Sequence, residues 1–109
     1  MMINAWFSLN LEKIKDIISD HFGFDVSDFT ATIKNSDGKN TLSIIHSTFA
    51  MRFTEDQIKE IIIDFFNNSN LATRICNARI STLEGSDMIT VYCEASKECL
   101  KDIAEFIGL

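Results

Sequence analysis

The 109-residue sequence contains no proline, only four glycines and three cysteines, and no long hydrophobic run. Because no linker or low-complexity segment divides the chain, we expect a single domain over residues 1–109. Three cysteines, an odd number, do not suggest a disulfide framework. No stretch approaches the ~20 apolar residues that span a bilayer, and residues 1–9 lack the basic start of a secretory signal. The sequence therefore predicts a reduced, soluble, cytoplasmic protein.

Basic residues are also scarce, because ten Lys and Arg stand against sixteen Asp and Glu, for a net charge of −6. Phosphate contacts require an excess of Lys and Arg, so we expect no direct binding of nucleic acid and no binding to a membrane surface. A basic protein partner is compatible with this charge, since opposite charge speeds the encounter. An acidic surface that only maintains solubility is the simpler interpretation.

Residues 53–68 predict a central helix between two β-hairpins. Thr54 and Gln57 have the spacing of a capping box, in which two side chains satisfy free backbone N–H groups. Acidic residues follow in the first turn, where the helix dipole favours them. Ile63 lies outside the apolar face, which indicates that the helix is covered from a second side. That face consists of Ile58, Ile61, Ile62, Phe65 and Phe66, recurring at helical spacing.

Two further helices flank the centre of the chain. Asn10 is a plausible N-cap for the first, and Gly23 suits its C-terminal end. Ser96 is a plausible N-cap for the last, which ends at Gly108. The expected inward stripes are Leu11, Ile14, Ile17, Ile18 and Phe22 in the first helix, and Cys99, Leu100, Ile103, Ala104 and Ile107 in the last.

The remaining segments predict strands. Residues 29–34 and 41–47 alternate in polarity around Asp37-Gly38, a strong hairpin signal. Residues 75–83 and 88–94 form a second hairpin, and residues 48–53 suit a shorter third strand before the central helix. Residues 1–8 give no assignment, although we expect Trp6 and Phe7 to pack against the body or in a dimer contact. The prediction is an α+β fold of order α-ββ(β)-α-ββ-α, with three helices packed on an antiparallel sheet of 4–5 strands.

The sheet face away from the helices is mostly small and polar, which suits either solvent or a docked partner. Ile45 and Tyr92 are its apolar exceptions. The expected members are Thr30, Thr32, Lys34, Ser43, Ile45, Asn77, Arg79, Ser81, Thr90 and Tyr92. From these we select Ile45, Arg79 and Tyr92 as candidate partner-binding residues, together with Ile63 and Trp6.

Candidate chemistry is sparse. His21 and His46, with the three cysteines, could form a zinc site or a Cys–His nucleophile pair. However, the chain has no Cys-x-x-Cys or His-x-x-x-His spacing, and nothing marks an oxyanion hole. The sequence also lacks a glycine-rich phosphate-binding loop and a nucleophile elbow. We therefore predict no catalytic residues, no metal, no cofactor and no enzyme activity.

Two motifs resemble a known family. The passage IIIDFFNNSN, residues 61–70, resembles an Asn-x-x-Asn exit from a middle helix, with Asn67 and Asn70 in the two positions. Phe22-Gly23-Phe24 is similar to an apolar–Gly–apolar helix ending. With the order of elements, the size and the acidic balance, residues 11–107 resemble the type III secretion chaperone-like superfamily, especially its YbjN-like branch. The resemblance implies a secretion-chaperone-like fold and a non-enzymatic protein binder, often a homodimer.

Three functions follow as hypotheses. The favoured one is a chaperone or adaptor that acts by surface contact with a protein partner, as a homodimer. The alternative is a small acidic inhibitor of phage or mobile-element type, anti-defence or anti-CRISPR-like, that blocks a basic surface of a nucleic-acid-handling complex. The third is a low-activity Cys–His hydrolase, which the absence of catalytic spacing disfavours.

Overall fold

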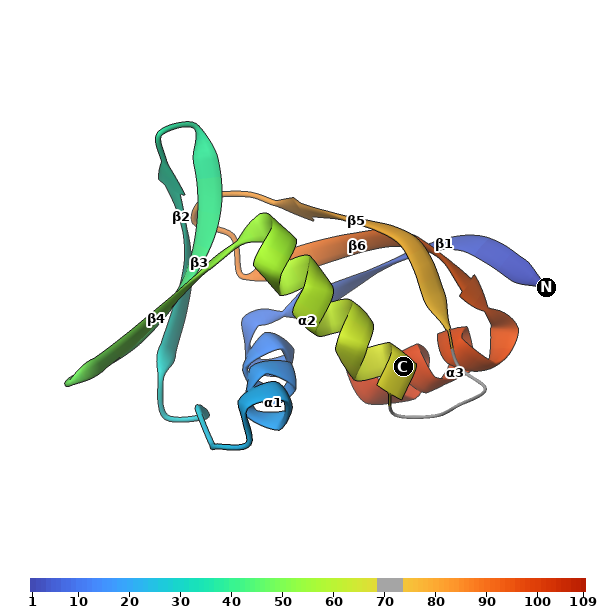
Figure 1. Cartoon of the computed structure of the whole chain (residues 1–109), viewed down its shortest axis with the longest axis horizontal. Coiled ribbons are helices and arrows are strands. Elements are labelled where there is room, and N and C mark those ends of the chain that lie inside the picture. The colour runs from blue at the N-terminus through green and yellow to red at the C-terminus, as the bar shows by residue number, and fades with distance from the viewer. Residues whose placement is uncertain (69–73) are drawn as a thin grey trace.

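The computed structural model describes residues 1–68 and 74–109, and this part of the chain forms an α+β fold (Figure 1). Three helices and six strands occur in it, so the predicted α+β class and its three helices are confirmed. In chain order the elements are β1 (Met2–Asn10), α1 (Leu11–Phe22), β2 (Thr30–Ser36), β3 (Lys39–His46), β4 (Phe49–Thr54), α2 (Glu55–Asn68), β5 (Ile75–Thr82), β6 (Met88–Ser96) and α3 (Lys97–Ile107).

The strands form two antiparallel sheets of three strands each, in the orders β1–β6–β5 and β2–β3–β4. The predicted single sheet of 4–5 strands is therefore wrong. The two hairpins meet where β5 ends and turns into β6, and the Asn40 side-chain amide in β3 donates to the Thr82 carbonyl at the end of β5 at 3.0 Å. There the Gly85 N–H donates to the Ile33 carbonyl at 3.1 Å, and the Asn35 N–H donates to the Glu84 carboxylate at 3.2 Å. These contacts join the sheets at one corner instead of merging them.

The unassigned N-terminal segment is the edge strand β1. It pairs with β6 along its whole length, from Met2 opposite Ser96 to Asn10 opposite Met88. A strand whose partner lies at the other end of the chain leaves little local signal, since its stability comes from the cross-strand pairs. The predicted order α-ββ(β)-α-ββ-α therefore lacked its first strand.

The helix ends lie where the sequence placed them. Asn10 and Ser96 each accept a hydrogen bond from the backbone N–H three residues on, at 2.8 and 3.1 Å. The Thr54 N–H donates to the Gln57 side chain at 2.9 Å, and the Gln57 N–H donates to the Thr54 hydroxyl at 3.2 Å. Gly23 ends α1 in the left-handed region, with φ of 76°. Short-range capping is thus set by local sequence.

One apolar core lies between the helices and both sheets, and α2 crosses in front of the β1–β6–β5 sheet (Figure 1). All three helices lie on that side, so the other face of the sheet is left uncovered. The largest fully buried side chains are Leu9, Ile14, Ile17, Ile18, Val26, Leu42, Ile44, Ile62, Ile89, Val91 and Cys99. Ser43, expected on the outer face, is buried instead.

Helix α1 departs from its predicted stripe at two positions. Phe22, expected to face inward, is exposed, and Lys15 is buried. The Lys15 ammonium donates to the carbonyls of Ser27 and Phe29, at 3.1 and 2.8 Å, and pairs with the Glu12 carboxylate at 3.0 Å. A buried ammonium needs such partners, and here they fix the segment between α1 and β2.

Among the helices that the structure describes, none is long and apolar enough to cross a membrane.

Candidate protein-binding surface

Three of the candidate residues form one row across the uncovered face of the β1–β6–β5 sheet. Trp6 in β1 lies directly opposite Tyr92 in β6, and Tyr92 lies opposite Arg79 in β5. The Arg79 guanidinium carbon is 4.9 Å from the centre of the Tyr92 ring, a cation–π distance. The Trp6 side chain is 68% exposed. We call these three residues the aromatic row.

A second, polar row lies beside the aromatic row. Asn4 in β1 is opposite Glu94 in β6, and the Asn77 side-chain amide donates to the Glu94 carboxylate. Asn77 has a φ of 52° at an irregularity in the pairing of β5 with β6, which is the backbone signature of a bulge. The bulge therefore brings the Asn77 side chain to the carboxylate.

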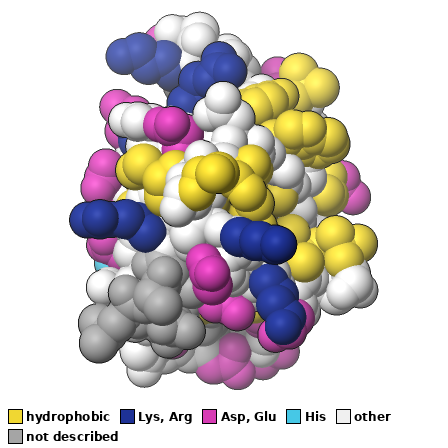
Figure 2. All heavy atoms as spheres, turned by 90° about the vertical axis from the view of Figure 1, so that its right-hand side faces the viewer, with side chains coloured by type: hydrophobic (Ala, Val, Ile, Leu, Met, Phe, Trp, Pro, Cys, Tyr) yellow, Lys and Arg dark blue, Asp and Glu magenta, His cyan; other side chains and the backbone are white. Residues whose placement is uncertain are grey.

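The two rows line a shallow hollow of about 420 Å³. Its lining residues are Asn4, Ala5, Trp6, Asn77, Arg79, Tyr92, Cys93 and Glu94. Figure 2, which views the molecule from the end where β1 begins, shows hydrophobic side chains gathered beside Lys, Arg and acidic groups. The hollow thus combines two large aromatic side chains with hydrogen-bonding groups of both signs. Neither of the two ion pairs in residues 1–68 and 74–109 involves Arg79.

The other two candidate residues lie apart from this surface. Ile45 is exposed on β3 in the second sheet, and Ile63 is half-buried on α2 against the core. Ile63 was expected to be covered from a second side of α2, and it packs against the core. The geometry therefore unites Trp6, Tyr92 and Arg79 and separates Ile45 and Ile63 from them.

A second apolar surface was missed by the sequence analysis. Phe22, Phe24 and Phe49 are between 43% and 48% exposed, and the Phe24 ring centre lies 6.1 Å from Phe22 and 6.4 Å from Phe49. We call these three residues the phenylalanine patch. The sequence signal was present in Phe22-Gly23-Phe24, because a left-handed glycine turns the chain and takes the next side chain off the helix stripe.

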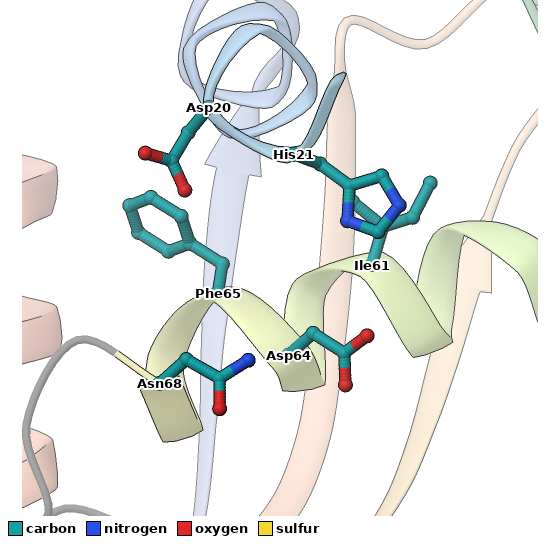
Figure 3. A pocket seen from close by; sticks show the side chains of 6 residues that line it. All are labelled: Asp20, His21, Ile61, Asp64, Phe65 and Asn68. Carbon is teal, nitrogen blue, oxygen red and sulfur yellow. The ribbon is translucent and has the colours of Figure 1, made fainter. Parts of the chain in front are cut away.

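A cavity of about 380 Å³ with a mixed polar and apolar lining lies between the end of α1 and α2 (Figure 3). Asp20 and His21 enter it from α1, and Asp64 and Asn68 enter from α2. The two carboxylates point away from each other in Figure 3, so they do not form an acid–base pair. In the described ranges, no group of three or more His, Cys, Asp or Glu is placed to hold a metal ion. Both histidines are exposed.

Two of the three thiols, Cys93 and Cys99, are buried. Burial, followed by the neighbouring thiols Cys99 and Cys76, raises the pKa of Cys93 to about 11. Burial also raises the pKa of Cys99. With raised pKa values, both thiols are protonated at neutral pH. They are therefore unreactive, because the thiolate is the reactive form. Their surroundings favour a packing role.

Comparisons of the chain with protein-family models, with curated proteins and with solved structures find no match.

Proposed function

We propose that this protein is a non-enzymatic binding module of chaperone or adaptor type, whose protein partner docks on the aromatic row. The observation that carries the proposal is the alignment of Trp6, Tyr92 and Arg79 across three neighbouring strands on the uncovered sheet face. Trp, Tyr and Arg are the residue types most enriched among side chains that dominate binding energy. Their placement in one row allows a single partner segment to contact all three.

The hollow suggests what kind of segment fits. An apolar side chain can pack on the Trp6 and Tyr92 rings, while a carboxylate can pair with the Arg79 guanidinium. Arg79 is already ordered by its contact with Tyr92, which reduces the entropy lost on binding. The Asn4 and Asn77 amides offer hydrogen bonds to a peptide backbone. We therefore expect an extended protein segment that carries an apolar and an acidic side chain.

Capture of partners from the source cells with the tagged protein tests the proposal. Arg79→Met and Tyr92→Ala should each weaken capture at least about tenfold, since hot-spot truncation commonly costs ~2 kcal/mol. Arg52→Met is the matched control, because Arg52 is an exposed arginine on β4 in the other sheet. Circular dichroism should show that all three variants are folded. Equal capture by Arg79→Met, Tyr92→Ala and Arg52→Met would exclude the aromatic row as the docking site.

Capture at increasing salt concentrations separates this function from the alternative of an acidic inhibitor. A protein of net charge −6 that blocks a basic surface should lose affinity steeply as salt rises from 0.05 to about 0.5 M, because salt screens exposed charges. Docking on the aromatic row should depend weakly on salt. Steep salt dependence together with full binding by Tyr92→Ala would favour the inhibitor.

A further inference from the structure

Within residues 1–68 and 74–109, each three-stranded sheet ends in two strands that lack a strand neighbour on one side. These edges are β1 and β5 in one sheet and β2 and β4 in the other. An open edge presents unpaired N–H and C=O groups that can pair with another chain. Proteins normally protect such edges with charge, bulges, short strands or a covering segment.

Three of the four edges carry such protection. In β5 the pairing is irregular between Cys76 and Arg79, and Arg79 adds a charge near the middle of the strand. The β2 edge is bonded to the β5–β6 turn through Ile33 and Asn35. The β4 strand has only six residues and carries Arg52. Each of these features disfavours pairing with a second chain.

The β1 edge has none of these features. It has nine residues, its register with β6 is continuous, and β6 is its only strand partner in the part of the chain that the structure describes. Residues 1–11 contain no charged side chain and no proline. Because the whole chain carries a charge of −6, two copies carry a net repulsion. The neutral β1 is where two copies can approach without that repulsion between side chains.

We propose that the open edge of β1 pairs antiparallel with the β1 edge of a second copy, so that two sheets form one continuous six-stranded sheet. Trp6 is the midpoint of Met2–Asn10, with four residues on each side. When the two strands align fully around a two-fold axis, Trp6 therefore faces Trp6 of the second copy. Close cross-strand aromatic pairs stabilise antiparallel sheets.

The rest of the strand is self-complementary in the same register. Asn4 faces Ser8 of the second copy, which places two small polar side chains together on the outer face. Ile3 faces Leu9 on the inner face. Ile3 is 38% exposed although it lies on the side of the buried Leu9, so pairing would extend the apolar layer over it. The strand β1 thus carries both a partly exposed apolar side chain, Ile3, and an edge without charged side chains.

The dimer would join two aromatic rows into one that crosses six strands. This inference rests on the proposed function, because it supplies the symmetric surface on which the protein partner would dock. Its failure is nevertheless distinguishable, since a monomer could still bind a partner through a single aromatic row. The mass of the protein tests the dimer, and capture tests the docking.

Sedimentation of the full chain over a range of concentrations tests the pairing. We expect a species of twice the 12.4 kDa chain mass. Trp6 is the only tryptophan, so its emission should shift to shorter wavelength as the dimer forms. Trp6→Lys and Trp6→Glu should each raise the dimer dissociation constant at least about tenfold, because like charges directly opposite each other destabilise a sheet.

Mixing the two variants provides the decisive measurement. Position 6 faces itself in the proposed register, so Trp6→Lys and Trp6→Glu should associate with each other more strongly than either does alone. Tyr92→Lys is the matched control, because it places the same charge on the same face but on the central strand β6. It should remain dimeric, and circular dichroism should show that every variant is folded.

Four results would overturn the proposal. The wild-type protein could be a monomer at all concentrations, or an assembly larger than a dimer. Trp6→Lys could dimerise as well as the wild type does. Finally, mixing the lysine and glutamate variants could produce no additional association, which would place the interface or the register elsewhere.

Discussion

The side-chain amide of Asn67 at the end of α2 makes two hydrogen bonds to the backbone of Ile75 at the start of β5. The Ile75 N–H donates to the Asn67 carbonyl oxygen at 2.6 Å, and the Asn67 amide nitrogen donates to the Ile75 carbonyl at 3.1 Å. The Asn67 amide thus pairs with the Ile75 backbone in the way that the backbone of a neighbouring strand would. It fixes the beginning of β5 against the central helix, and β5 carries Arg79 of the aromatic row.

Asn67→Ala should lower the free energy of unfolding by about 1–3 kcal/mol, because it leaves two partly buried backbone groups without partners. Urea denaturation measures the change. Asn68→Ala is the matched control, since the neighbouring Asn68 is exposed at the same helix end. An equal effect of the two substitutions would show that the Asn67 hydrogen bonds add nothing to stability.

Lys15→Met should also destabilise the fold, although lysine substitutions on helix surfaces usually cost little. The buried Lys15 ammonium donates to the carbonyls of Ser27 and Phe29, and methionine keeps most of the packing but none of these bonds. We expect a loss of about 1–3 kcal/mol. Lys101→Met on the exposed side of α3 should change stability by less than about 0.5 kcal/mol. Thermal and urea unfolding of both variants decide between these outcomes.

Local sequence predicted the helices and hairpins well, because their signals lie within a few residues. Asn10, Thr54 and Ser96 cap helices through groups three residues away. The division into two sheets was not predictable in this way. It depends on β1 pairing with β6, whose residues lie more than 75 positions later, as in the pair Asn10 and Met88. Hairpin patterns predict which two strands pair within each hairpin, but they do not predict the hairpin with which an N-terminal strand pairs.

The sequence identified the residues of the candidate surface, but it did not predict how they are arranged. Alternation placed Tyr92 and Arg79 on one face, and Trp6 was expected to pack against the body or in a dimer contact. Only the register of β1 brings Trp6 into the same row. Ile45 follows the same alternation, but it belongs to the second sheet. Whether these residues bind a partner is still a prediction, as is the resemblance to the secretion chaperones.

Phe24→Ser tests the phenylalanine patch separately from the aromatic row. Because Phe24 is about half exposed, the substitution should cost less than about 1.5 kcal/mol, well below the ~3–5 kcal/mol of a truncated core phenylalanine. It should reduce binding of a hydrophobic fluorescent dye, since exposed apolar patches bind such ligands. Capture of the proposed partner should be unchanged. Loss of capture in this folded variant would instead assign docking to the patch.

The raised pKa of Cys93 predicts how stability changes at alkaline pH. Burial keeps this thiol protonated in the folded protein up to a pKa of about 11, compared with the usual 9.0. Between these values the unfolded thiol loses its proton while the folded one retains it, so the unfolded state binds fewer protons. The free energy of unfolding should therefore fall as pH rises from 9 to 11.

Urea denaturation at pH 8.0, 9.5 and 10.5 measures this decline. Cys93→Ala removes the Cys93 contribution, so its stability should fall less steeply over the same range, and any remaining decline reports Cys99 and other groups. Equal slopes for the wild type and the variant would show that Cys93 ionises alike in the folded and unfolded states, contrary to its burial. A thiol reagent provides a second measurement at pH 7. Cys76 is the least buried of the three cysteines, and it should react before Cys93 and Cys99.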